Sequence, residues 1–258
     1  MEILWITPRR FGADMCQTTQ IGAGKAISRL NHSVTFLSPQ SKEFEPIAGL
    51  KFLELEYSPR FSIQTLGMER AIRKNLRGIL DSLSVDICIV EWQLANSSSK
   101  ILIEKSIPWV ILDRSPPIPT GIKGRIQALH YRKSWKLASR SDGACVKSDH
   151  LLNHLSGRYE LPERTAVMPS GVDLEIFEEP QPKPTQLKVA YHGRLDKLRD
   201  IDAIVQACEI INSTGGGVSL LLFGEGDLYR NLTRKADATP WMEVMGRVPP
   251  DSVPGILD

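Results

Sequence analysis

The fold is decided by residues 187–227, which read LKVAYHGRLDKLRDIDAIVQACEIINSTGGGVSLLLFGEGD. They predict a short strand over 188–191, a turn at His192-Gly193, a helix, and a second strand over 218–223. The helix is indicated by apolar residues spaced three and four apart, namely Ile201, Ile204, Val205, Cys208 and Ile211. This order of elements is typical of a parallel α/β unit that binds a nucleotide at the carboxyl ends of its strands.

Two arginines lie where this helix should begin, Arg194 beside the Gly193 turn and Arg199 just after it. A helix N-terminus offers unpaired N–H groups and a partial positive charge, and a guanidinium presents a planar fork that matches two phosphate oxygens. We therefore expect a diphosphate to bind here. The alternative for both arginines is a surface ion pair with Asp196 or Asp202.

Several ordered motifs resemble the donor-binding domain of family 4 (group 1) glycosyltransferases, which are retaining enzymes of the GT-B fold. They are HGRL followed by Arg199, then LLLFGEGDLYRNL, then WMEVMGRVPPDSVPGIL. The earlier run MPSGVDLEIF resembles the usual interdomain turn of that family. The resemblance implies an α/β protein of two Rossmann-like domains that face each other across a cleft.

The resemblance also assigns roles to residues. Arg194 and Arg199 would bind the diphosphate and stabilise the charge that develops on the leaving nucleoside diphosphate, a catalytic role. Glu225 would accept a hydrogen bond from the nucleotide or remain a solvated loop acid. Asp200 stands where the family has glycine. Its carboxylate would repel a diphosphate unless it points away or pairs with a neighbouring cation. The remaining expected substrate-binding residues are Gly12 in the first domain and Gly193, Gly224, Gly226, Arg247 and Val248 in the second.

The predicted domains are 1–177, a Rossmann-like acceptor-side domain, and 187–258, part of a nucleotide-sugar-binding domain. A polar, proline-spaced linker over 178–186 joins them. Only three strands are predicted after residue 187, and the E-x7-E motif that grips the sugar and the ribose in the family has no counterpart here. Two interpretations follow: the chain is the amino-terminal portion of a longer enzyme, or it is a truncated product that cannot catalyse transfer.

The charge and cysteine content of the chain limit the classes of partner and the cell compartment that we expect. A net charge of +2 favours no nucleic-acid partner, and the four cysteines are scattered without metal-ligand spacing, so we expect reduced thiols, no metal site and a cytoplasmic protein. The most basic segment begins at Gly121 and ends at Arg140. It is either a solvated helix face or a cationic surface for a phosphorylated or lipid-linked acceptor, with peripheral contact at the inner membrane surface. Within it, Tyr131 and Trp135 would suit an interface or a core.

The expected function is transfer of a hexose, with retention and without metal or cofactor, from a UDP- or GDP-type donor to a glycan or lipid-linked acceptor. The alternative is a non-catalytic GT-B-like protein that binds a nucleotide sugar or pairs with an active subunit. A third possibility, an epimerase of the same fold, lacks the carboxylate and histidine pair that acid/base chemistry would need at strand ends. Gly22-Ala23-Gly24 is too far from the first strand to form a dinucleotide-binding turn.

Overall fold

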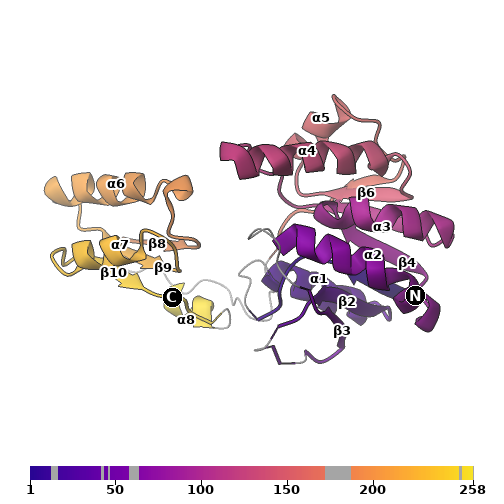
Figure 1. Cartoon of the computed structure of the whole chain (residues 1–258). Helices are drawn as coiled ribbons and strands as arrows, with labels where there is room; N and C mark the ends of the chain where they lie inside the picture. Colours follow the sequence, from indigo (N-terminus) through magenta and orange to yellow (C-terminus); the bar gives the residue numbers. More distant parts are fainter. Residues whose placement is uncertain are drawn as a thin grey trace. The chain divides into compact units, whose positions relative to one another are not determined.

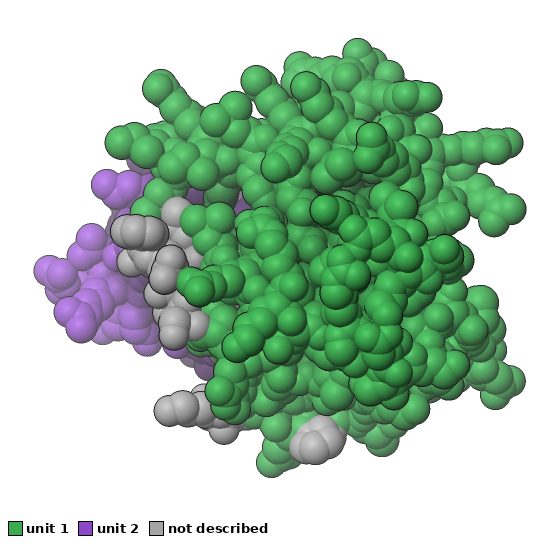
Figure 2. Space-filling view, turned by 45° about the vertical axis from the view of Figure 1, so that its right-hand side comes forward, with its two compact units in different colours: residues 1–172 green, residues 173–258 purple. Residues whose placement is uncertain are grey.

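The computed structural model describes residues 1–12, 17–41, 44–45, 47–57, 64–171, 187–249 and 252–257. The chain divides into two compact units, Met1–Val172 and Asp173–Asp258 (Figures 1 and 2). The predicted linker over 178–186 lies outside the described residues, as does Cys16, one of the four cysteines. The predicted α/β class is confirmed.

Unit 1 contains a parallel sheet of seven strands in the order β3-β2-β1-β4-β5-β6-β7. The strands are apolar runs, as expected for a sheet covered by helices on its faces. Their order reverses between β1 and β4, and ligands bind open α/β sheets at such a switch point. The bounds are β1 (Glu2–Ile6), β2 (Ser33–Pro39), β3 (Leu50–Leu55), β4 (Ile87–Glu91), β5 (Trp109–Asp113), β6 (Gly143–Val146) and β7 (Thr165–Val167).

Alternate residues of these strands face two separate cores. In β1, Leu4 packs with α2, α3, α4 and α5, whereas Trp5 packs on the opposite face with Phe36 and α1. The two-residue repeat of a strand therefore fixes which helices cover which face. The helices are α1 (Gln17–Arg29), α2 (Gln64–Ser82), α3 (Trp92–Glu104), α4 (Gly121–Ala138) and α5 (Asp149–Ser156), and Figure 1 shows α2, α3 and α4 running side by side.

Unit 2 contains a parallel sheet of three strands in the order β10-β9-β8. Its core joins the predicted apolar face of α6, through Val205 and Cys208, to Leu220 and Leu222 of the central strand. The elements are β8 (Lys188–His192), the 3-10 helix η1 (Lys197–Arg199), α6 (Ile201–Ser213), β9 (Ser219–Phe223), α7 (Tyr229–Ala236), β10 (Met242–Met245) and α8 (Val253–Leu257). Among the helices of the described ranges, none is both long and apolar enough to cross a bilayer.

Candidate functional site

Three loops meet at the carboxyl end of the sheet in unit 2. The Gly193 amide, after β8, donates to the carbonyl of Phe223 at the end of β9 (3.1 Å), and the Leu195 amide donates to the carbonyl of Glu225 (2.9 Å). The Gly224 amide in turn donates to the carbonyl of Gly246, after β10 (3.1 Å). These bonds fix the loops to one another at the edge where parallel α/β sheets bind ligands.

The glycines of these loops are required by close backbone packing. A Cβ on Gly224 would lie 1.8 Å from the carbonyl oxygen of Gly193, and one on Gly226 would lie 2.2 Å from the carbonyl oxygen of Leu195. Gly193 and Gly224 also have φ values of 155° and 145°, which L side chains rarely adopt. The space that side chains would occupy at Gly224 and Gly226 is thus filled by the neighbouring loop.

A pocket of about 420 Å³ opens beside these loops. This volume is in the range of about 300–1,000 Å³ that is usual for small-molecule sites. The pocket brings together the predicted Glu225 and Gly226 with Gly246, which directly precedes the predicted Arg247 and Val248. Its lining combines carboxylates, a phenol and a guanidinium, and consists of Glu225, Gly226, Asp227, Tyr229, Arg230 and Gly246.

Arg194 forms the surface ion pair that the sequence left open. Its Nε lies 3.0 Å from Oδ2 of Asp196, and its side chain is 64% exposed. The other carboxylate oxygen of Asp196 accepts from the Leu198 amide (3.1 Å) and so holds the start of η1. Arg199 is exposed at the end of η1, two residues before α6 begins. Both arginines therefore stand near the N-terminus of α6.

Asp200 links η1 to α6 in a left-handed conformation, with φ 50° and ψ 42°. Glycine adopts this conformation without steric cost, whereas an aspartate does so with strain. The Asp200 side chain is exposed, makes no capping hydrogen bond with α6, and forms no ion pair with any residue that the structure describes. Its carboxylate remains beside the helix end where a diphosphate would bind.

Two aromatic rings support the loop after β8. The imidazole of His192 stacks on Phe223, with ring centroids 4.8 Å apart, and desolvation lowers the pKa of His192. Tyr191 donates its hydroxyl hydrogen to the carbonyl of Arg194 (3.0 Å). The backbone that carries Arg194 is thus held by side chains of the preceding strand.

Gly12, the predicted site residue of unit 1, lies after β1 near the switch point. Its φ is 84°, and its amide donates to the Gln17 side chain. Nearby, the buried carboxylate of Glu91 at the end of β4 accepts hydrogen bonds from Gln20 and from Thr7 (3.2 Å). Arg9 Nε lies 3.9 Å from the same carboxylate. The sequence does not indicate this polar cluster, because its members are far apart in the chain; its signal in the sequence is a glutamate that ends an apolar strand.

Asp113, at the end of β5, faces the protein interior. It is fully buried, and its Oδ2 accepts hydrogen bonds from the Tyr131 hydroxyl and from Trp135 Nε1 (3.0 Å) on α4. Burial raises the pKa of Asp113, while these hydrogen bonds act in the opposite direction. Tyr131 and Trp135 are themselves buried, so they serve the core. Asp113 therefore joins β5 to α4 and does not line an open site.

The chain shares its fold with solved glycosyltransferases. Sucrose-phosphate synthase from Thermosynechococcus elongatus matches with a TM-score of 0.77 at 14% identity, over 98% of this chain and 72% of that one. HepE from Anabaena, solved in complex with UDP-glucose, matches with a TM-score of 0.66 at 13% identity, over 100% of this chain and 71% of that one. A TarM mutant from S. aureus, solved with fondaparinux, alpha-GlcNAc-glycerol and UDP, matches with a TM-score of 0.71 at 8% identity, over 97% of this chain and 78% of that one.

These likenesses show that the fold is that of the GT-B glycosyltransferases. Neither a protein-family model nor a curated protein matches the sequence. Within the described ranges, no group of three or more His, Cys, Asp and Glu side chains is arranged to hold a metal ion.

Proposed function

We propose that this chain is a glycosyltransferase of family 4 that moves a hexose from a UDP- or GDP-type donor to a glycan or lipid-linked acceptor in glycan biosynthesis. The observation that carries the proposal is the set of three loops in unit 2 that bond to one another beside a pocket. Arg194 and Arg199 stand near the N-terminus of α6 and are not among the residues that line this pocket. Retention of configuration and independence of metal and cofactor rest on the motif resemblance.

We assign the pocket to the nucleoside part of the donor. Glu225 is exposed on its rim and would accept a hydrogen bond from the nucleoside, while the backbone of Arg247 and Val248 would face the base. Tyr229 and Arg230, which come from the first turn of α7, add an aromatic surface and a cation. A hydroxyl-rich, partly aromatic ligand matches this mixture of donors and acceptors.

The diphosphate would lie at the Gly193 turn and the N-terminus of α6. Arg194 would reach it by exchanging Asp196 for phosphate. The Arg194 side chain is 64% exposed and free to move outward, and Asp196, whose side chain is 14% exposed, would keep the hydrogen bond from the Leu198 amide. Arg199 adds a second guanidinium. Both side chains would stabilise the negative charge that grows on the leaving nucleoside diphosphate as the bond to the hexose breaks. Gly12 of unit 1 would let backbone approach the donor phosphates, as the resemblance implies.

A cytoplasmic location belongs to this proposal. Cys88, Cys145 and Cys208 are free thiols, and Cys88 and Cys208 are buried. Free cysteines are usual in a reducing compartment.

A second candidate is a GT-B-like protein that binds a nucleotide sugar, or pairs with an active subunit, without catalysing transfer. The observations that favour it are the Arg194–Asp196 ion pair and the Asp200 carboxylate at the start of α6, which pairs with no cation in the described part of the chain. Both reduce the positive potential available to a diphosphate.

Incubation of the purified chain with UDP- and GDP-hexoses distinguishes the two candidates. Release of the nucleoside diphosphate, with or without transfer to an added glycan, supports the transferase. Binding of the donor with no release supports the non-catalytic protein. Absence of binding to any nucleoside diphosphate or nucleotide sugar would remove the transferase and the nucleotide-sugar-binding protein, and would leave only pairing with an active subunit.

A further inference from the structure

The outward face of α4 carries large apolar side chains that are open to solvent. Ile122 is 79% exposed, Ile126 is 46% exposed and Leu129 is 64% exposed. Because successive residues of an α-helix are about 100° apart around the axis, these three side chains lie within an arc of about 60°. They form a continuous line, which we call the apolar stripe, and Ile118, just before the helix, is exposed as well.

Cations surround the apolar stripe. Lys133 and Lys136 continue its line toward the end of the helix, and Arg125 and Arg132 flank it on one side. The sequence has no Asp or Glu between Asp113 and Asp142, and none of these cations forms an ion pair with another residue in the described part of the chain. The face therefore combines exposed apolar area with uncompensated positive charge.

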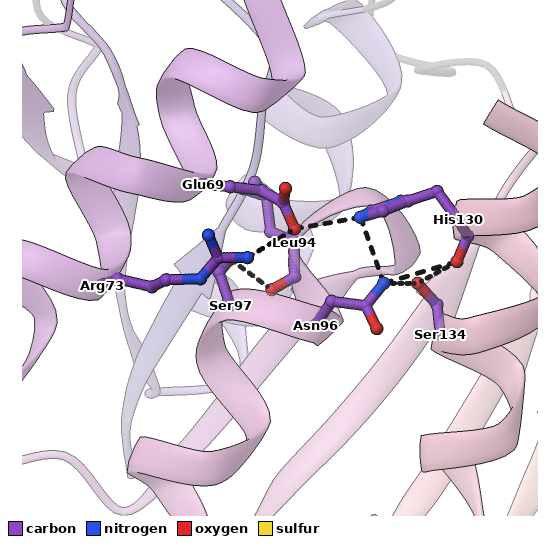
Figure 3. Close-up of polar contacts among 7 residues, drawn as sticks. All are labelled: Glu69, Arg73, Leu94, Asn96, Ser97, His130 and Ser134. Carbon is purple, nitrogen blue, oxygen red and sulfur yellow. Dashed lines mark hydrogen bonds and ion pairs between the residues drawn. The ribbon is translucent and has the colours of Figure 1, made fainter. Parts of the chain in front are cut away.

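Polar contacts on the inward side of α4 and along one edge of the apolar stripe attach the helix to its neighbours and set its rotation. On α3, Asn96 Nδ2 donates to Ser134 Oγ of α4 (2.8 Å), and His130 Nε2 of α4 lies 2.9 Å from Glu69 Oε1 of α2 (Figure 3). The bond from Trp135 to Asp113 adds a third attachment, to β5. These attachments fix the rotation of α4 with its apolar stripe outward.

We propose that this face of α4 binds an anionic lipid surface. The apolar stripe would enter the boundary between headgroups and acyl chains, and the flanking Lys and Arg side chains would contact lipid phosphates. A second copy of the chain is a poor occupant, since two such faces would bring like charges together with no acid to offset them. A polyanion that binds through charge alone would leave the exposed isoleucines and the leucine in contact with water.

The test is flotation of the full chain with vesicles of phosphatidylcholine alone and of phosphatidylcholine mixed with phosphatidylglycerol. We expect binding to the mixed vesicles, weakened by salt, and little binding to the neutral ones. The double variant Lys133→Gln, Lys136→Gln should bind about 25-fold more weakly, at about fivefold per cation. The double variant Ile122→Ser, Ile126→Ser should bind about 100-fold more weakly, because serine contributes no apolar area to insertion.

Matched variants elsewhere on the surface serve as controls. Arg70→Gln with Lys74→Gln removes two exposed cations of α2, and Ile103→Ser with Ile210→Ser removes two exposed isoleucines of α3 and α6. Both control variants should bind like the unmodified chain. Serine and isoleucine have similar helix propensities, so circular dichroism should show the same fold in all variants.

Three results would overturn the proposal. They are equal binding to neutral and anionic vesicles, equal losses in the control and α4 variants, and a change of oligomeric state in the stripe variant without a change in vesicle binding. The vesicle assay uses no nucleotide sugar, so its outcome is independent of the proposed transferase activity.

Discussion

Replacing Gly224 with alanine tests whether direct backbone packing holds the loops of unit 2 together. The new Cβ would lie 1.8 Å from the carbonyl oxygen of Gly193. This steric clash can be relieved only if the two loops separate, and that movement breaks the hydrogen bond from the Gly193 amide to the Phe223 carbonyl (3.1 Å). The φ of 145° adds a conformation that alanine avoids.

The expected loss of unfolding free energy in Gly224→Ala has two causes. A sparsely populated backbone conformation costs about 1–3 kcal/mol. Overpacking a close-packed site costs about 1–3 kcal/mol more. We therefore expect the free energy of unfolding of unit 2 to fall by about 2–6 kcal/mol, which is a large part of what a unit of this size holds.

Hydrogen exchange read by mass spectrometry measures this loss separately in each unit. Peptides that cover β8 and β9 should lose protection, while peptides that cover β4 and β5 should not. Gly78→Ala is the matched control, because its Cβ would meet nothing within 4 Å. In the middle of α2 that change should stabilise unit 1 by about 1 kcal/mol. Unchanged protection of β8 and β9 in Gly224→Ala would refute the loop packing described above.

Four further predictions follow from single contacts. Asp200→Gly should raise the free energy of unfolding by about 1 kcal/mol, because it relieves the left-handed strain, and should tighten binding of UDP or GDP; equal affinity in calorimetry would contradict a diphosphate at the start of α6. Asp113→Ala should cost about 2–4 kcal/mol in urea unfolding, because it leaves the Tyr131 and Trp135 donors buried without an acceptor, and Asp113→Asn should cost less. Burial raises the pKa of the Cys88 thiol to about 12, so iodoacetamide at neutral pH should label Cys88 only after unfolding, which peptide mass mapping would check. Desolvation lowers the pKa of His192 below 6.5, because the folded state favours the neutral imidazole. The stability that His192 contributes is therefore complete above the ordinary histidine pKa and declines as the pH falls and the imidazole takes up a proton. An NMR titration of His192 with a midpoint at or above 6.5 would contradict the stacked geometry.

Much of the fold follows from local pattern. The apolar runs that become β1, β4 and β9 are short and bounded by turn residues, and the three- and four-residue spacing from Ile201 onward defines the buried face of α6. Such signals depend on neighbours in the sequence, so a reader of the chain can find them. The turn at Gly193 and the loop around Gly224 could be located in the same way.

At several positions, the residue type is explained only by contacts between parts of the chain that are distant in the sequence. Gly226 is glycine because the Leu195 carbonyl occupies its side-chain space, and no pattern within either loop indicates that approach. The polar cluster of Thr7, Gln20 and Glu91 likewise brings together three separate elements. On α4 the sequence indicates a basic segment, whereas only the packing of His130 and Ser134 against α2 and α3 places Ile122 and Leu129 outward.

The central claim is that unit 2 binds a nucleoside diphosphate where the loops after β8 and β9 meet the start of α6. Titration calorimetry of UDP and GDP against the full chain tests it most directly, with Arg194→Ala, Arg199→Ala and the control Arg234→Ala, an exposed arginine of α7 that bonds to Asn231. We predict affinity losses of about 10- to 100-fold for the first two variants, as expected for a charged hydrogen bond to phosphate, and no change for the third. Equal affinity in all three variants would contradict the account.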